Sequence, residues 1–140
     1  MEKAKRSISS NFCENFISFL RRIAKEYQKD EFVDFLQNIN EYIVIINTVK
    51  NRDPMSVIEG FRDNFLRYYS KQIKDKDEKF FLSCYDERMK NRDVKQRVDQ
   101  FRKVFRSEYT TENKKNMFWD YLNQLIKNVE VYNKIREKKK

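Results

Sequence analysis

The sequence predicts an all-α domain, a compact bundle of about five helices in an orthogonal or up-down arrangement. The 140 residues include one Gly and one Pro, whereas turn-rich β folds need many of both. Aromatic residues make up 15% of the chain, which is more than disordered chains contain. Apolar residues also recur at three- and four-residue steps, the spacing of one helix face. We therefore expect one folded domain over residues 1–140.

The first helix is expected to follow a basic, flexible lead-in over residues 1–9. Ser9 or Ser10 offers a side-chain oxygen that caps a first helical turn. The helix is predicted to end before Lys29-Asp30, and Asp30 is the predicted cap of the next helix. The apolar face of the first helix consists of Phe12, Phe16, Phe19, Leu20, Ile23 and Tyr27.

The second helix is expected to lie at the centre of the bundle. Its main apolar face fits within an arc of about 100°. Val44 and Ile45 lie outside that arc, and a helix that is apolar on more than one side is typical of a position between neighbours. The main face consists of Phe32, Phe35, Leu36, Ile39, Tyr42, Ile43 and Ile46.

Asp53-Pro54 marks the start of the third helix, because Asp caps a helix and Pro favours its first position. Gly60 lies inside this helix, where a small residue would let another helix approach closely. A charged connector follows over residues 74–78, and residues 79–82 are expected to form one short helical turn. The apolar residues of the third helix are Val57, Ile58, Phe61, Phe65, Leu66, Tyr68 and Tyr69.

Two further helices are predicted, one over residues 87–106 and one that begins near Thr110 or Thr111. Thr110 with Asn113 offers capping chemistry for the last helix. Residues 134–140 include five basic residues and one acidic residue, and this tail is expected to be frayed and flexible. The core face of the last helix consists of Phe118, Tyr121, Leu122, Leu125, Val129 and Tyr132.

The net charge of +9 is concentrated in three segments. Residues 1–29 carry +4, residues 88–106 carry +6 and residues 134–140 carry +4. Such an excess is typical of a nucleic-acid-binding or acidic-partner-binding surface. An A/T-rich codon bias would favour Lys and Asn without any such partner, and the sequence leaves this alternative open.

The helix over residues 87–106 is the candidate binding surface. Beside its apolar stripe, five basic side chains fall within about 80° and form a row roughly 27 Å long. Such a row suits the phosphates of DNA or RNA, or an acidic protein partner such as residues 30–50 of a second copy. An ordinary solvated helix face is the alternative. The row consists of Arg88, Arg92, Lys95, Arg102 and Arg106.

Trp119 and Ile126 form a second candidate surface on the last helix. They lie about 100° away from its core face. Trp is enriched at interface hot spots, so the pair is a candidate contact with a protein partner. The alternative is a wide core face beneath a neighbouring helix.

The composition excludes several classes of enzyme and metal site. No His is present, which removes the commonest general base and metal ligand. Two Cys cannot build the usual four-ligand zinc site, and a single Gly removes glycine-rich phosphate loops. We therefore expect no enzymatic activity, no metal, no cofactor and no small-molecule substrate.

The chain is expected to be intracellular, or part of a virion if its source is viral. Its longest apolar run, Tyr42–Ile46, is far shorter than the ~20 residues of a membrane span. The first 15 residues lack the apolar core of a signal peptide. Both cysteines are therefore expected to be reduced, with Cys13 as a small core residue.

Two stretches of the sequence resemble segments of small helical proteins of nucleocytoplasmic large DNA viruses. The resemblance covers about residues 70–130. It implies a viral accessory protein or a virion component, and it implies no catalytic residues. The stretches are Ile73–Leu82, a charged run that ends in Phe-Phe-Leu, and Thr111–Lys114 followed by Trp119–Leu122.

Together these observations predict a non-enzymatic helical interaction or structural protein. A protein partner or self-association is expected, with the basic face setting the orientation and rate of association. The alternative is a sequence-nonspecific DNA- or RNA-binding protein that uses the basic row on the fourth helix. No membrane partner is expected.

Overall fold

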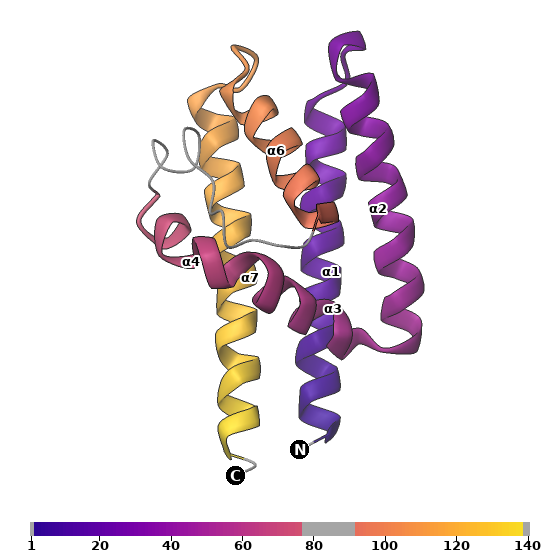
Figure 1. Ribbon diagram of the computed structural model, residues 1–140, viewed down its shortest axis with the longest axis vertical. Coiled ribbons are helices and arrows are strands. Elements are labelled where there is room, and N and C mark those ends of the chain that lie inside the picture. Colours follow the sequence, from indigo (N-terminus) through magenta and orange to yellow (C-terminus); the bar gives the residue numbers. More distant parts are fainter. Residues whose placement is uncertain (1, 77–91, 139–140) are drawn as a thin grey trace. The chain divides into compact units, whose positions relative to one another are not determined.

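The computed structural model describes residues 2–76 and 92–138 (Figure 1). Over these residues the chain forms helices and short turns without a β-strand, so the predicted all-α class is confirmed. The described residues form five helical stretches, as expected. These are α1 (Glu2–Glu26), η1 (Asp30–Phe32) with α2 (Val33–Arg52), α3 (Pro54–Phe61) with a π-helical segment (Arg62–Leu66) and α4 (Arg67–Lys74), α6 (Arg92–Arg106), and α7 (Glu112–Lys138).

The chain divides into two compact units, which are described separately. Unit 1 consists of residues 1–59 and 127–140, and unit 2 consists of residues 60–126. Unit 1 therefore contains α1, α2 and the second half of α7, whereas unit 2 contains α4, α6 and the first half of α7. The single domain expected over residues 1–140 stays a prediction.

In unit 1, α1 and α2 form an antiparallel hairpin held by aromatic side chains. Phe16 meets Tyr42 edge to face, with 5.7 Å between ring centroids. Tyr27 meets Phe32 at 5.1 Å, close to the turn that joins the two helices. The predicted apolar face of the first helix is buried throughout. The predicted face of the second helix is also inside, with Leu36 and Tyr42 half-buried.

The predicted caps of the first two helices are wrong. α1 begins at Glu2, because the Lys, Ala and Arg residues that follow are good helix formers and extend the helix beyond its apolar stripe. Residues 2–9 are therefore helical rather than a flexible lead-in, and Ser9 is buried inside the helix. Asp30 is the first residue of η1, and Lys29 at the N-cap makes no side-chain capping hydrogen bond.

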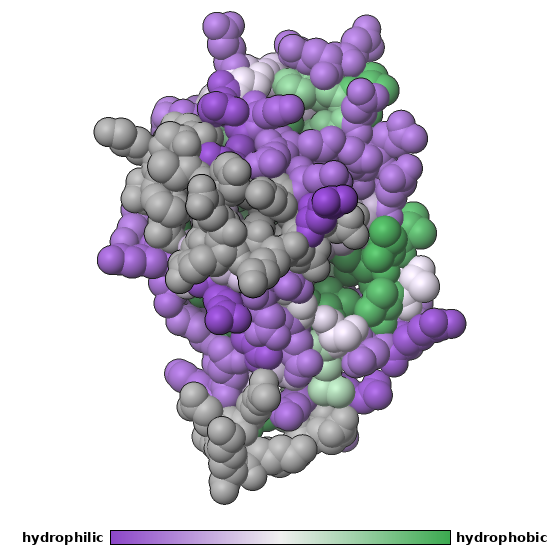
Figure 2. All heavy atoms as spheres, in the orientation of Figure 1, coloured by the Kyte–Doolittle hydropathy of each residue, from purple (hydrophilic) through white to green (hydrophobic). Residues whose placement is uncertain are grey.

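The predicted central position of α2 is also wrong. Val44 is 64% exposed and Ile45 is 48% exposed, so the side of α2 that faces away from α1 is open to solvent. Figure 2 shows green, hydrophobic spheres along the right-hand edge of the molecule, over α2. The extra apolar residues of α2 thus lie on the surface.

The break at Asp53-Pro54 is confirmed, since α2 ends at Arg52 and α3 begins at Pro54. Pro suits this position because the first helical N–H has no partner within the helix. The π-helical segment that follows α3 was not predicted. Its wider turn brings the N–H of Arg67 to the carbonyl of Arg62, five residues back, and such single widened turns have no simple sequence signature.

Gly60 does not mark a close approach of another helix. Its φ is not positive, and a methyl group placed there would meet Asn64 Nδ2 at 4.0 Å as its nearest neighbour among the described residues. Gly60→Ala is therefore expected to raise the free energy of unfolding by about 0.5–1 kcal/mol, because Ala restricts the unfolded chain more than Gly does. Urea denaturation measures this change. A loss of stability would instead show that the following π-helical turn requires the freedom of Gly60.

In unit 2, α6 and the first half of α7 share an aromatic cluster. The ring of Phe118 lies 4.9 Å from Phe101 and 5.6 Å from Phe105. The predicted core face of the last helix is confirmed, with Tyr121 half-buried and the other five members buried. α6 begins at Arg92. The residues expected to start it, 87–91, and the short turn expected over 79–82 lie outside the described residues.

α7 begins at Glu112, close to the predicted start, but the predicted cap at Thr110 is wrong. The N-cap is Thr111. Its Oγ1 accepts a hydrogen bond from the Lys114 N–H at 3.4 Å, whereas the Thr110 hydroxyl donates to the Val104 carbonyl at 2.7 Å and closes the end of α6. Thr111→Ala is expected to lower the free energy of unfolding by about 0.5–1 kcal/mol. Thr111→Ser keeps the hydroxyl oxygen that accepts the hydrogen bond from the Lys114 N–H, and it serves as the control. Equal losses in both variants, measured by thermal unfolding, would contradict the capping role.

The prediction of a frayed basic tail over residues 134–140 is wrong for most of that segment. α7 continues to Lys138, so the chain is helical well past residue 134, and only residues 139–140 of the tail lie outside the described residues. Basic side chains at a helix C-terminus interact favourably with its last carbonyl groups. This interaction accounts for a helix that extends into a segment without an apolar stripe.

Candidate interaction surfaces

The predicted basic row on α6 is interrupted by a buried arginine. Arg92 and Arg106 are exposed, but Arg102 is only 7% exposed, and its Nη1 lies 3.7 Å from Asp99 Oδ1. On the helical wheel Arg102 is about 40° from Val98. Its aliphatic stem therefore follows the edge of the apolar stripe, as long basic side chains often do. Arg102 does not belong to a solvated binding face.

The remaining members of that row are only partly described. Arg88 lies outside the described residues, and Lys95 belongs to α6 with a side chain that the structure does not describe. Arg92 and Arg106 are thus the predicted binding residues whose exposure is established. They are 14 residues apart on the helix, or about 21 Å.

Trp119 and Ile126 are core residues, so their prediction as a protein interface is corrected. Trp119 is 4% exposed and Ile126 is 3% exposed. The Trp119 ring packs against Phe105 in unit 2, with 5.6 Å between centroids. α7 has a core face wider than one stripe, which was the alternative interpretation of these two residues. Neither side chain offers surface to a partner.

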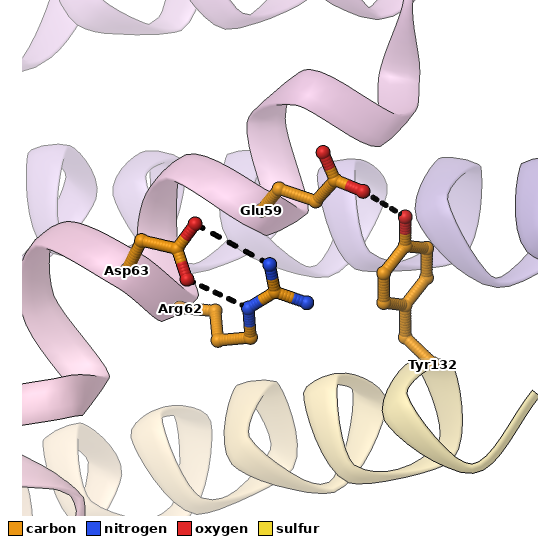
Figure 3. Close-up of polar contacts among 4 residues, drawn as sticks. All are labelled: Glu59, Arg62, Asp63 and Tyr132. Atoms are coloured by element: carbon orange, nitrogen blue, oxygen red, sulfur yellow. Dashed lines mark hydrogen bonds and ion pairs between the residues drawn. The ribbon is translucent and has the colours of Figure 1, made fainter. Parts of the chain in front are cut away.

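Figure 3 shows two polar contacts, one in each unit. In unit 1 the Tyr132 hydroxyl donates a hydrogen bond to Glu59. In unit 2 the Arg62 guanidinium donates to both oxygens of Asp63, at 2.8 Å and 3.3 Å. Each carboxylate therefore faces a hydrogen-bond donor. Among the described residues, no three His, Cys, Asp or Glu side chains gather in a way that would hold a metal ion.

Cys13 is the buried core residue that the sequence predicts. It is 0% exposed, and its Sγ donates a weak hydrogen bond to the Pro54 carbonyl at 3.9 Å. Burial raises the pKa of Cys13 to about 11, a shift that the nearby Lys50 partly opposes. Since the thiolate is the nucleophile, Cys13 is expected to be nearly inert at neutral pH.

Alkylation of the Cys84→Ser variant tests this expectation, because Cys13 is then the only thiol among the two cysteines of the chain. With a pKa near 11, labelling of the native protein at pH 8 should be at least about 100-fold slower than in denaturant. The rate should rise about tenfold per pH unit up to that pKa. Rapid labelling at pH 8 would contradict the burial of Cys13.

The outer face of α2 is the first surface that the structure reveals. It is unusual because residues 35–49 contain one charged residue, Glu41, in a chain in which 38% of residues are charged. Its members recur at three- and four-residue steps, the spacing of a helix–helix seam. Val44 and Ile45 already stand out in the sequence as apolar residues outside the main face of the helix. There they predicted a central helix rather than an exposed apolar face. The outer face consists of Asp34, Gln37, Asn38, Glu41, Val44, Ile45, Thr48 and Arg52, all exposed.

The charged ends of this outer face have no partners within the described chain. Asp34 and Glu41 lie in its first half and Arg52 lies at its end, and none of the three forms an ion pair with another described residue. Lys50, on another side of α2, is held by Glu14 of α1 at 3.5 Å. The outer face thus carries Asp34 at its start, Glu41 beside Val44 and Ile45 in its middle, and Arg52 at its end.

A second surface lies where the two ends of the chain meet in unit 1. Asn15 Nδ2 donates to Asn128 Oδ1 at 2.9 Å, so α1 and the second half of α7 are neighbours there. The two helices run in opposite directions, and the N and C labels lie at the same end of Figure 1. Two of the three basic segments therefore meet. The basic residues that the structure describes at this basic end are Lys3, Lys5, Arg6 and Lys134.

Comparisons with family models, with curated proteins and with solved structures find no match to this chain. The resemblance to small helical proteins of large DNA viruses therefore stays an expectation that rests on two short stretches. Among the described residues, no helix combines the length and the apolar character that crossing a membrane requires.

Proposed function

We propose that this chain is a non-enzymatic structural protein that self-associates through the outer face of α2. The observation that carries the proposal is the apolar, nearly uncharged middle of an exposed helix face, with Val44 64% and Ile45 48% exposed. Exposed apolar groups arranged at helix–helix spacing are typical of an interaction surface. A second copy of the chain is the partner that the charge pattern of this face favours.

An antiparallel pair of α2 helices places opposite charges together at both ends. Asp34 and Arg52 are 18 residues apart, or about 27 Å along the helix. When two copies are related by a twofold axis near the middle of α2, Asp34 of each copy faces Arg52 of the partner subunit. With the axis at residue 43, Val44 packs near the partner subunit's Val44, and Ile45 lies at the level of the partner subunit's Glu41. Such an interface is closed and self-complementary.

A parallel pair would be less favourable, because like charges would face each other along the whole seam. It would also align the two helix dipoles in the same direction. The antiparallel pair uses one face of one helix per copy, which is at the small end of specific interfaces. We therefore expect a dissociation constant in the micromolar range.

Sedimentation velocity of the full chain from about 1 to 500 µM tests self-association directly. The Asp34→Arg and Arg52→Asp variants each place like charges at both ends of the seam. Each is expected to weaken association roughly 2- to 30-fold, since an exposed ion pair contributes about 0.2–1 kcal/mol and two are lost. The double variant D34R/R52D restores the pairing and is expected to dimerise like the wild type.

Two outcomes would overturn this proposal. A chain that stays monomeric at 500 µM does not self-associate through any surface. A double variant as weak as the single variants would show that Asp34 and Arg52 do not face each other, which contradicts the antiparallel pair.

The proposal agrees with the role that the viral resemblance implies. A virion component or accessory scaffold assembles through contacts between copies. The alternative function, nonspecific binding of DNA or RNA by the basic row on α6, is less favoured. Arg102 is buried, so the row that would meet the phosphates loses a central member. Charge reversal of Arg92 and Arg106 tests this alternative, which predicts a uniform loss of affinity for all sequences.

A further inference from the structure

We propose that Glu41 keeps the affinity of the α2 seam low, so that association between copies is readily reversible. The α2 seam is the antiparallel contact between the outer faces of two α2 helices, and the inference therefore rests on the proposed self-association. Three features of Glu41 carry it: its place on the outer face, the lack of a partner for its carboxylate, and its position relative to the twofold axis.

Glu41 occupies the centre of the outer face of α2. On the helical wheel the other members of that face spread about 60° to either side of Glu41. Glu41 is also the one charged residue among residues 35–49, and it lies close to the midpoint of α2, which runs over Val33–Arg52. A charge therefore stands at the position where an apolar side chain would bury most surface against a partner helix.

The carboxylate of Glu41 has no partner within the described part of the chain. Glu41 is exposed, and its side chain forms no ion pair or hydrogen bond with another described residue. Arg52 is the cation on the outer face, 11 residues further along the helix, or about 16 Å away. The neighbours of Glu41 one turn away on the same face are all uncharged. These are Gln37, Asn38, Val44 and Ile45.

The α2 seam brings the two Glu41 carboxylates toward each other. With the twofold axis at residue 43, Glu41 and Glu41 of the partner subunit are offset by four residues, or about 6 Å along the helix. Packed helix axes are about 8–10 Å apart, so two side chains that point into the seam place their carboxylates roughly 8 Å from each other. Asp34 and Arg52 pair at the ends of the seam and leave both carboxylates without a cation. Association therefore takes two like charges out of water, which is unfavourable.

A central charge of this kind weakens a helix–helix contact without preventing it. A polar residue at one position of a coiled-coil seam lowers its stability and restricts its pairing. Opposite charges at both ends of the α2 seam favour association, as does Val44 near the axis, whereas the two Glu41 carboxylates oppose it. Glu41 thus keeps the seam in the range in which copies separate and re-form.

Sedimentation velocity of Glu41→Gln tests this role, because Gln has nearly the same shape and no charge. The E41Q variant is expected to dimerise roughly 3- to 30-fold more tightly than the wild type at about 50 mM salt, the range for two unit charges about 8 Å apart near a protein surface. Its fold should be unchanged, since Glu41 is exposed and Gln favours helix about as well. The matched control is Asp120→Asn, which changes the net charge equally at an exposed position of α7 and should dimerise like the wild type.

Salt separates charge repulsion from a gain in packing. The ratio of the dissociation constants of the wild type and E41Q should fall at least about twofold between 50 mM and 1 M salt, because the Debye length is then only about 3 Å. The end pairs of Asp34 with Arg52 are present in both proteins and cancel in this ratio. A ratio that does not change with salt would contradict the repulsion.

Mixing Glu41→Lys with the wild type tests whether the two side chains approach each other. Each homodimer then opposes like charges, whereas a mixed dimer places an ammonium group near a carboxylate. Native mass spectrometry of E41K with ¹⁵N-labelled wild type should find mixed dimers as at least about three quarters of all dimers, rather than the half that random pairing gives. Asp120→Lys mixed with the wild type in the same way should pair at random.

Three outcomes would overturn the assignment of Glu41. If the wild type dimerises but E41Q is no tighter than D120N, self-association stands and Glu41 does not control it. Random pairing of E41K with the wild type would likewise show that the two Glu41 side chains do not meet in the dimer. If neither the wild type nor E41Q dimerises at 500 µM, the α2 seam itself is absent and the proposed function fails first.

Discussion

Replacing Phe118 by alanine is expected to lower the free energy of unfolding by about 3–5 kcal/mol, the usual cost of deleting a fully buried Phe. Phe118 is 0% exposed, and its ring contacts Phe101 and Phe105 of α6 at 4.9 Å and 5.6 Å. Truncation would leave a cavity in the cluster that joins α6 to α7. Aromatic pairs of this geometry add about 0.5–1.5 kcal/mol beyond buried area, so the effect should lie in the upper part of the range.

Urea denaturation followed by circular dichroism measures this loss. Asn116→Ala is the matched control, since Asn116 is exposed on the same helix and surface changes usually stay within about 0.5 kcal/mol. A loss below about 1 kcal/mol for Phe118→Ala would show that the aromatic cluster of unit 2 is not tightly packed.

Replacing Val44 and Ile45 together by glutamate is expected to weaken self-association by at least about 100-fold, or roughly 2.7 kcal/mol. Both side chains lie in the middle of the outer face of α2, where the twofold axis would bring four new carboxylates close together. Like charges removed from water without partners are strongly unfavourable. The monomer should keep its fold, because both positions are exposed and Glu favours helix.

The control for this variant is N11E/S18E, which changes the net charge equally at two exposed positions of α1. It should dimerise like the wild type. Equal weakening by the two double variants would indicate general charge repulsion and would contradict a seam at Val44 and Ile45.

The sequence predicts the local part of this structure well because helices follow local rules. The three- and four-residue spacing identifies the buried faces of α1 and α7, including Phe12 and Leu125, both 0% exposed. Asp53-Pro54 also predicts a helix boundary, since a proline fixes φ and lacks an N–H whatever surrounds it. These features need no knowledge of which helices meet.

The features that the sequence does not predict depend on long-range contacts. Val44 and Trp119 both lie off the main apolar stripe of their helices, yet one is exposed and the other is buried. Periodicity alone cannot distinguish them, because the difference is whether a neighbouring helix covers that side. The basic end likewise depends on the contact of Asn15 with Asn128, 113 residues away in the chain. Arg102 shows a third limit of prediction from periodicity. A side chain at the edge of an apolar stripe fits either the buried or the exposed face of its helix.

Disulfide cross-linking of single-cysteine variants tests the central claim, an antiparallel α2 seam, most directly. Asn38, Val44 and Thr48 are exposed members of the outer face of α2, and each is replaced by Cys in the Cys84→Ser background, where buried Cys13 should stay inert. A disulfide requires Cα atoms within about 7 Å. We predict that V44C cross-links to itself, whereas N38C and T48C cross-link only when mixed with each other. Self-cross-linking of all three variants would indicate a parallel pair, and no cross-linking beyond that of Ser18→Cys on α1 would contradict an interface on α2.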